Sequence, residues 1–167
     1  VFASSLDDDP AREQAAVSAF LRRRVDGLIL TTVSESQSYL APELRRGTPV
    51  VFVDREPAGV TSDTVVSDNR DGAALATRHL LERGHRRLAY FGDRSTIRTA
   101  QERRRGFLDE LGSAGVATRD IPVVEDLHDE AAARRAAIEL FTRPDPPTAI
   151  FSSQNLVTIG VIRALRE

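Results

Sequence analysis

The stretch VVSDNRDGAALATRHLLERGHRRLAYFGD, residues 65–93, contains a strand, a helix and a second strand in succession. Between residues 69 and 83 apolar side chains recur at helical spacing, and Gly84 follows where a left-handed helix cap would stand. The runs on either side, residues 64–67 and 87–93, have the β-branched or aromatic composition of short strands. A helix of this length between two strands is typical of a parallel sheet with crossover helices.

The same alternation of short apolar runs and amphipathic stretches continues in both directions along the chain. It predicts six or seven strands, at residues 1–4, 27–31, 49–53, 64–67, 87–93 and 148–151 and near Val123. It predicts helices at residues 36–46, 69–83, 99–114 and 129–142, one after an Asp9 cap with Pro10 in its first turn, and one from Asn155 onward. The predicted fold class is α/β, with parallel sheets flanked by helices.

Two successive sets of strands and helices meet near residues 84–87. We therefore expect an N-terminal lobe over residues 1–84 and a C-terminal lobe over residues 85–167. The chain stops inside a predicted helix, in the letters VIRALRE, without a polar cap or a glycine stop, so we expect a fragment of a larger protein.

Composition and charge argue against several classes of protein. The 167 residues are 41% hydrophobic and carry a net charge of −2 with both signs interspersed, so no overall basic surface is expected to bind nucleic acid. No apolar run is long enough to span a membrane, and neither a membrane partner nor a secretion signal is expected. The absence of cysteine excludes disulfides and cysteine-bound zinc and agrees with a cytoplasmic location.

Polar side chains directly follow the predicted strands, at the sheet edge where ligands of open α/β folds bind. Such side chains can hydrogen-bond the hydroxyl groups of a polar ligand. They are Ser4–Ser5, Thr31–Thr32, Asp54–Arg55, Asp68–Asn69, Asp93–Arg94, Ser152–Ser153 and Asn155, and Ser5 is the candidate ligand residue from the first strand. The alternative is that these residues only form turns and helix caps, as Asp68 would do ahead of its helix.

Arg103 is a sharper candidate for ligand binding. Near the start of its predicted helix, it can point back over the strand ends, where its planar fork can bind two vicinal hydroxyls or a carboxylate. The alternative is that the letters ERRRGF, residues 102–107, form only a solvated basic face.

Enzymatic motifs are not visible in the sequence. His79, His85 and His128 lack the spacing of a metal site, no serine stands in a nucleophile elbow, and no glycine-rich nucleotide loop is present. We therefore expect no enzyme, no catalytic residue, no cofactor and no bound metal, although an enzyme that uses the Asp-rich loops remains an alternative.

Three segments together resemble the core of LacI/GalR-family transcription regulators. They are residues 65–93 quoted above, ERRRGFLDEL at residues 102–111, and PPTAIFSSQNLVTIGVIRAL at residues 146–165. Periplasmic sugar-binding proteins share the fold and parts of these motifs. The letters LLERGHRRLAYFG, residues 80–92, are more similar to the regulators, which favours a cytoplasmic regulator.

The resemblance implies a two-lobed, periplasmic-binding-protein-like (type I) fold with a cleft between the lobes for a small polar effector such as a sugar. It also implies a homodimer and a helix-turn-helix headpiece, outside this chain, that binds operator DNA. By the same comparison the chain is incomplete at both ends: it lacks the first strand and helix of the N-terminal lobe and the last third of the C-terminal lobe. The alternative is the periplasmic sugar-binding receptor of an ABC transporter.

The resemblance also assigns roles to single residues. Arg103 matches the arginine that holds the ligand, Thr99 a pocket residue one turn earlier, and Asp68 a residue at the crossover between the lobes. His128 matches a position that is often aromatic. Asn155 stands where many members have an aspartate, so sugar specificity cannot be carried over, because an amide both donates and accepts hydrogen bonds.

The effector itself is not identified by this comparison. Ile97 stands where a purine-sensing member has arginine, which argues against a purine. Whether the effector induces or co-represses, and which operator is bound, stay open.

Overall fold

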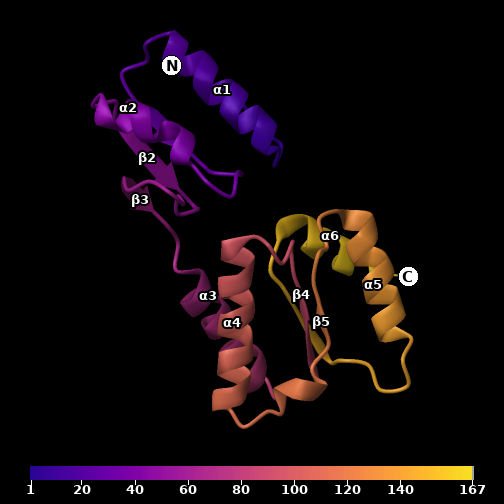
Figure 1. Ribbon diagram of the computed structural model, residues 1–167. Helices are drawn as coiled ribbons and strands as arrows, with labels where there is room; N and C mark the ends of the chain where they lie inside the picture. Colours follow the sequence, from indigo (N-terminus) through magenta and orange to yellow (C-terminus); the bar gives the residue numbers. More distant parts are fainter. Residues whose placement is uncertain (167) are drawn as a thin grey trace. The chain divides into compact units, whose positions relative to one another are not determined.

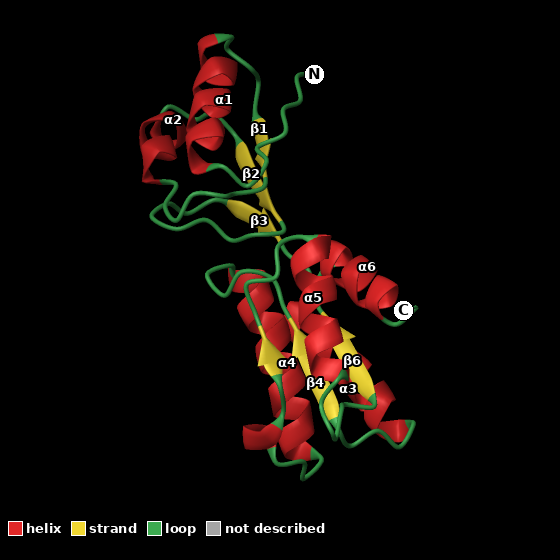
Figure 2. Cartoon of the chain, turned by 90° about the vertical axis from the view of Figure 1, so that its right-hand side faces the viewer, coloured by secondary structure: helices red, strands yellow, loops and turns green. Residues whose placement is uncertain are grey.

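Two parallel sheets of three strands each, flanked by helices, form the framework of the computed structural model, which describes residues 1–166 (Figures 1 and 2). The first sheet has the order β1-β2-β3, with strands at Leu28–Leu30, Val50–Val53 and Asp63–Val65. The second has the order β5-β4-β6, with β4 at Leu88–Phe91, β5 at Val123–Val124 and β6 at Ala149–Ser152. All neighbouring strands are parallel, which confirms the predicted fold class.

The helices begin and end close to the predicted residues, except that the helix expected at residues 36–46 is α-helical only over Ala41–Arg45. They are α1 (Pro10–Arg22), α2 (Ala41–Arg45), α3 (Asn69–Glu82), α4 (Arg98–Ser113), α5 (Glu130–Phe141) and α6 (Asn155–Ala164), with short 3₁₀ turns at Ser38–Leu40 and Thr118–Asp120. Asp9, Asp68 and Asp129 accept backbone N–H groups at the starts of α1, α3 and α5. Gly84, with a φ of 88°, follows α3 in the left-handed conformation that its sequence position predicts.

The chain divides into two units, Val1–Ser67 and Asp68–Glu167, earlier in the sequence than the predicted boundary after residue 84. The reason is the packing of α3 against α4, its neighbour in the second unit (Figure 1). Gly106 of α4 lies against the backbone of Arg70, and the Arg78 guanidinium binds the Glu110 carboxylate at 2.8 Å. In sequence, α3 lies between the strands of the first sheet and those of the second, and by its packing it belongs to the second unit.

The predicted strand at residues 1–4 is not formed, and this prediction was wrong. The segment is exposed, and a strand requires a neighbour to pair with its backbone groups. The nearest strand in sequence, β1, is the edge of its own sheet and pairs with β2, while its Ile29 side chain is 81% exposed.

Each unit has its own hydrophobic core. In the first unit the core joins α1 to the sheet through Val17, Leu30 and Phe52. In the second unit, α5 and α6 cover one face of the sheet, and α3 and α4 cover the other, where the rings of Tyr90, Phe107 and Phe151 contact one another. Within residues 1–166, no helix is both long and apolar enough to cross a membrane.

Candidate functional site

The carboxyl edge of the second sheet gathers the polar residues of the second unit. β4, β5 and β6 each run into a loop that leads to the start of a helix, α4, α5 or α6. Because all three strands are parallel, these loops lie at the same edge. The start of α3 reaches this edge as well, as the contacts of Arg103 show.

Arg103 lies at this edge and is partly buried. Its Nε donates to Asn69 Oδ1 at 2.7 Å, and its Nη1 donates to the Ser153 carbonyl oxygen at 2.7 Å. The guanidinium therefore bridges the first residue of α3 and the residue that follows β6. Arg105, two residues later, is exposed and pairs with Glu102, so only part of the ERRRGF segment is a solvated basic face.

Two buried hydroxyl groups accompany Arg103. Thr99, one turn earlier on α4, is 9% exposed, and Ser153 is 7% exposed. Within the described chain, Ser153 Oγ makes no hydrogen bond of standard geometry. Burial raises the pKa of the Tyr90 hydroxyl, and the nearby Ser153 side chain opposes part of that rise. The Tyr90 hydroxyl itself donates to the Ala100 carbonyl oxygen, so this cluster adjoins the first turn of α4.

The other predicted residues of the second unit are exposed. Asp68 is the N-cap of α3 and accepts from the Asp71 N–H at 3.0 Å, so it performs the capping role that was its simplest explanation. Asn155 begins α6, and its Oδ1 accepts from the Leu156 N–H at 2.9 Å. His128 lies in the loop between β5 and α5. All three lie at or just ahead of helix starts on the same sheet edge, and Arg103 hydrogen-bonds Asn69 and Ser153 instead.

Asn69 and Ser153 were missed as individual site residues. Both were among the polar residues after the strands, but the prediction chose their neighbours Asp68 and Asn155. Asn69 is the first residue of α3 and Ser153 directly follows β6, and no local signal in the sequence separates them from their polar neighbours.

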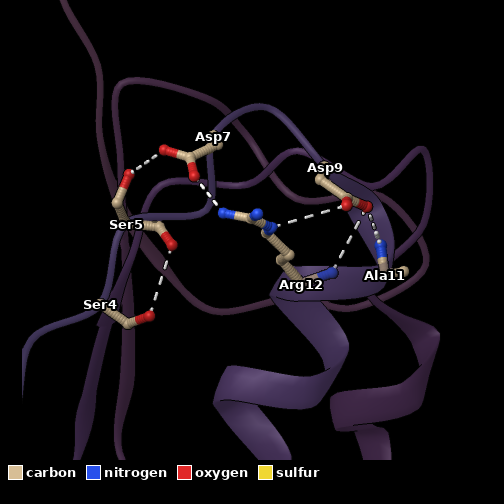
Figure 3. Close-up of polar contacts among 6 residues, drawn as sticks. All are labelled: Ser4, Ser5, Asp7, Asp9, Ala11 and Arg12. Carbon is tan, nitrogen blue, oxygen red and sulfur yellow. Dashed lines mark hydrogen bonds and ion pairs between the residues drawn. The ribbon is translucent and has the colours of Figure 1, made fainter.

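Ser5 belongs to the first unit and lies in an exposed loop ahead of α1 (Figure 3). Its hydroxyl donates to Asp7 Oδ1 at 2.7 Å, and Asp7 also pairs with Arg12. Figure 3 shows this chain of contacts beside the Asp9 cap of α1. Ser5 and its partners thus lie in the first unit, and Arg103 with Asn69 and Ser153 lies in the second.

The first unit has a cavity of about 540 Å³ beside β1. Its polar lining includes Ser5, Asp8, Thr31 and Arg55, and the remainder is largely apolar, from the N-terminal segment, α1 and β1. The Arg55 side chain is 21% exposed, and its Nη1 donates to the Thr32 carbonyl oxygen at 3.0 Å.

The first unit also contains a buried carboxylate, that of Glu13, next to the Val33 backbone at the edge of this cavity. Glu13, on α1, is 0% exposed and accepts hydrogen bonds from the N–H groups of Val33 and Ser34 and from the Tyr39 hydroxyl. Burial acts to raise the pKa of Glu13, but these hydrogen bonds together outweigh it and hold the pKa below the ordinary value. The sequence did not reveal Glu13, because an acidic residue in the first turn of an amphipathic helix is usually solvated.

The lowered pKa of Glu13 predicts acid sensitivity of the first unit. A carboxylate whose pKa is lower in the folded state stabilises the fold above its unfolded pKa, and this contribution is lost as the pH falls below about 4.3 and through the folded pKa. The Glu13→Gln variant is expected to be less stable at pH 7 but to show a shallower loss of stability with acid. Urea unfolding at pH 7, 5, 4 and 3 measures this, and parallel pH profiles for the two proteins would contradict it.

Across residues 1–166, no group of three His, Asp or Glu side chains is arranged to hold a metal ion. What the two sheet edges offer is hydrogen-bond donors and acceptors: a guanidinium, hydroxyls, an amide and carboxylates. These groups suit the recognition of a polar molecule by hydrogen bonds.

Comparison with known proteins finds a matching family model over residues 2–167, described as periplasmic binding proteins and the sugar-binding domain of the LacI family. The transcriptional regulator GalR of Escherichia coli K12 is 28% identical over 156 residues, which are 93% of this chain and 46% of GalR. The transcriptional repressor PurR of Erwinia tasmaniensis is 30% identical over 158 residues, with the same two shares. The chain thus spans about half the length of these curated relatives, which are regulators and not enzymes.

Solved structures agree in fold. A protein of Burkholderia thailandensis assigned as a ribose operon repressor superposes with a TM-score of 0.86 at 34% identity, over 99% of this chain and 61% of that one. The regulator Cra of Pseudomonas putida, solved with fructose 1-phosphate, gives a TM-score of 0.83 at 24% identity over the same shares, and this likeness concerns the fold alone.

Proposed function

Since this chain belongs to the family of periplasmic binding proteins and LacI-type sugar-binding domains, we propose that it is the effector-sensing part of a LacI-type transcription regulator. The effector is a small polar molecule of the sugar class. The relatives named above are helix-turn-helix regulators, which favours this function over that of a periplasmic transport receptor.

The observation that carries the proposal is the position of Arg103. The guanidinium is fixed at the carboxyl edge of a parallel sheet by two hydrogen bonds, which use two of its five N–H donors. The remaining donors suit the hydroxyl oxygens of a sugar. The buried hydroxyls of Thr99 and Ser153 stand beside it, and we propose that Asp68, His128 and Asn155 border the same ligand.

In this proposal the effector acts by binding one conformation of the protein better than another. The helix-turn-helix headpieces of a cytoplasmic homodimer sense that difference and bind or release operator DNA. No chemical change in the effector is required. Reading the gene upstream of the codon for Val1 distinguishes a transcription regulator from a periplasmic transport receptor. A helix-turn-helix encoded there indicates the regulator, and a signal peptide indicates the receptor.

A thermal-shift screen tests the ligand class. The panel contains pentoses, hexoses and their phosphates, including D-ribose and fructose 1-phosphate, with hypoxanthine as a purine comparison. At about a hundred times its dissociation constant, a bound sugar adds roughly 2.7 kcal/mol of stability and raises the melting temperature. We expect a rise with at least one sugar and none with hypoxanthine. A panel in which only hypoxanthine stabilises the protein would overturn the sugar class.

A further inference from the structure

We propose that the first unit has a contact surface for the phosphate backbone of DNA, formed by five exposed arginines at the amino edge of its sheet. These arginines, called the basic edge below, are Arg22, Arg23, Arg24, Arg45 and Arg46. The proposal rests on the proposed function and extends it, because it gives the sensing part a sequence-independent contact of its own with the DNA that the regulator binds.

The fold of the first unit brings the two groups of arginines to one edge. Residues 22–24 end α1 and lead into β1, and residues 45–46 end α2 and lead into β2. The two strands are parallel neighbours with Leu28 opposite Val50, so both turns lie at the amino ends of the strands. The turns also touch, since the Leu28 N–H donates to the Pro49 carbonyl oxygen at 2.9 Å.

The charges of the first unit are separated between the two edges of its sheet. The carboxyl edge has two arginines, Arg12 and Arg55, among the acidic side chains of Asp7, Asp8, Asp9, Glu13, Glu35, Asp54 and Glu56. The five arginines of the amino edge are accompanied by the acidic residues Asp26, Glu43 and Asp63. The amino edge is therefore positive, although the chain as a whole carries a charge of −2. A local positive surface of this kind attracts phosphates.

Arg24 occupies a backbone conformation that favours glycine. It follows α1 with a φ of 53°, whereas the same left-handed position after α2, α3 and α4 is held by Gly47, Gly84 and Gly115. A residue with a Cβ is less stable in this conformation than glycine. The helix dipole favours a cation here, but Arg22 in the last turn of α1 already meets that preference. The fold therefore does not require an arginine at position 24, and strain of this kind is typical of functional sites.

Most of the guanidinium groups of the basic edge keep donors free for a ligand. Arg23 lies over the ring of Phe2, 4.9 Å from its centroid, and a contact through the face leaves the N–H groups at its rim available. Arg46 pairs with Glu43. The side chains that have no partner among the described residues are those of Arg22, Arg24 and Arg45.

The surroundings of the arginines indicate the kind of partner. The two turns, residues 22–27 and 45–49, contain none of the exposed large apolar side chains of the described chain. A protein interface has an apolar core, and a segment that lies on a membrane inserts apolar side chains. Phosphate groups of DNA require only donors and positive charge, which arginine supplies with its planar fork. The basic edge therefore fits a DNA backbone better than a protein or a membrane.

The test measures the binding of this chain to a fluorescein-labelled DNA duplex of random sequence, about 30 base pairs long, by fluorescence anisotropy between about 50 and 200 mM NaCl. We expect weak binding that weakens steeply with salt. The triple variant Arg22→Gln/Arg24→Gln/Arg45→Gln removes the arginines without partners. It is expected to bind the duplex at least tenfold more weakly at about 100 mM NaCl, with a salt slope smaller by about two to three.

The matched control removes three exposed arginines of the second unit, each in an ion pair, and changes the net charge equally. This variant is Arg105→Gln/Arg119→Gln/Arg143→Gln. At about 100 mM NaCl exposed charges act over only about 10 Å, so we expect its affinity for the duplex to fall less than threefold. Equal losses in the two triple variants would assign the binding to net charge and overturn the inference.

Arg24→Gly separates a contact with DNA from a structural role. Because glycine relieves the left-handed strain, this variant is expected to unfold at a higher urea concentration than the wild type and yet to bind the duplex about threefold or more weakly. Unchanged duplex affinity in Arg24→Gly would remove this residue from the surface.

Two further outcomes overturn the inference: no binding of the duplex by the wild type, and binding of phosphatidylserine vesicles in its place. Neither affects the proposed function, which the thermal-shift screen with sugars tests separately. A chain that binds the duplex but is stabilised by no sugar would support the basic edge and count against the sugar class.

Discussion

Replacing Gly106 with alanine is expected to lower the free energy of unfolding by about 2 kcal/mol. A Cβ at this position would collide with the backbone carbonyl of Arg70 and lie 3.1 Å from the Cβ of Ala73, so α3 and α4 would have to separate. Helix propensity favours alanine over glycine by about 1 kcal/mol, which is less than overpacking of this kind costs. Urea unfolding of the second unit measures the difference.

Gly112→Ala provides the matched control in the same helix. Nothing lies within 4 Å of a Cβ at Gly112, so only the propensity gain remains, and we expect this variant to be stabilised by up to about 1 kcal/mol. The same substitution six residues apart thus has opposite signs. Equal effects at the two positions would show that α3 is not packed closely on α4.

Arg103→Ala is expected to weaken sugar binding by about 30-fold or more, which corresponds to roughly 2 kcal/mol. Two sources of loss are expected: the guanidinium donors proposed to bind the sugar are removed, and Asn69 Oδ1 and the Ser153 carbonyl lose the donor that positions them. Calorimetry with the sugar that gives the largest thermal shift measures the change, and circular dichroism verifies that the fold is retained.

Arg105→Ala is the control for charge, because it removes the same type of side chain from the exposed side of α4, where Arg105 pairs with Glu102. We expect its sugar affinity to equal that of the wild type. An Arg103→Ala variant that keeps full affinity would remove Arg103 from the site and with it the main support for the proposed function.

Local patterns in the sequence predicted most of the fold. Periodicity and caps gave most of the helices nearly to the residue, as at Asp9 with Pro10 for α1 and at Gly84 after α3, whereas the helix expected at residues 36–46 is α-helical only over Ala41–Arg45. Two features differ from what local patterns suggest: residues 1–4 form no strand, and the compact units divide after Ser67, earlier in the sequence than the lobe boundary expected near residue 84. Both depend on which distant segment lies alongside, and local spacing carries no information on that.

The candidate site was predictable to a similar extent. The position of Arg103 on its helix indicated that it could face the strand ends, and the structure places its guanidinium there. The partners Asn69 and Ser153 come from elements that are distant in sequence, so spacing could not select them. Glu13 was overlooked, since its burial depends on the Val33 and Ser34 N–H groups that fold over it.

The chain contains two tyrosines and no tryptophan, and one tyrosine falls in each unit: Tyr39, bonded to Glu13, and Tyr90, in the aromatic core of the second unit. Ultraviolet emission from the unmodified protein is therefore a sum of two separate reporters. In a Tyr39→Phe protein only the second unit emits, and in a Tyr90→Phe protein only the first. The melting of each half can thus be followed optically without attaching a dye.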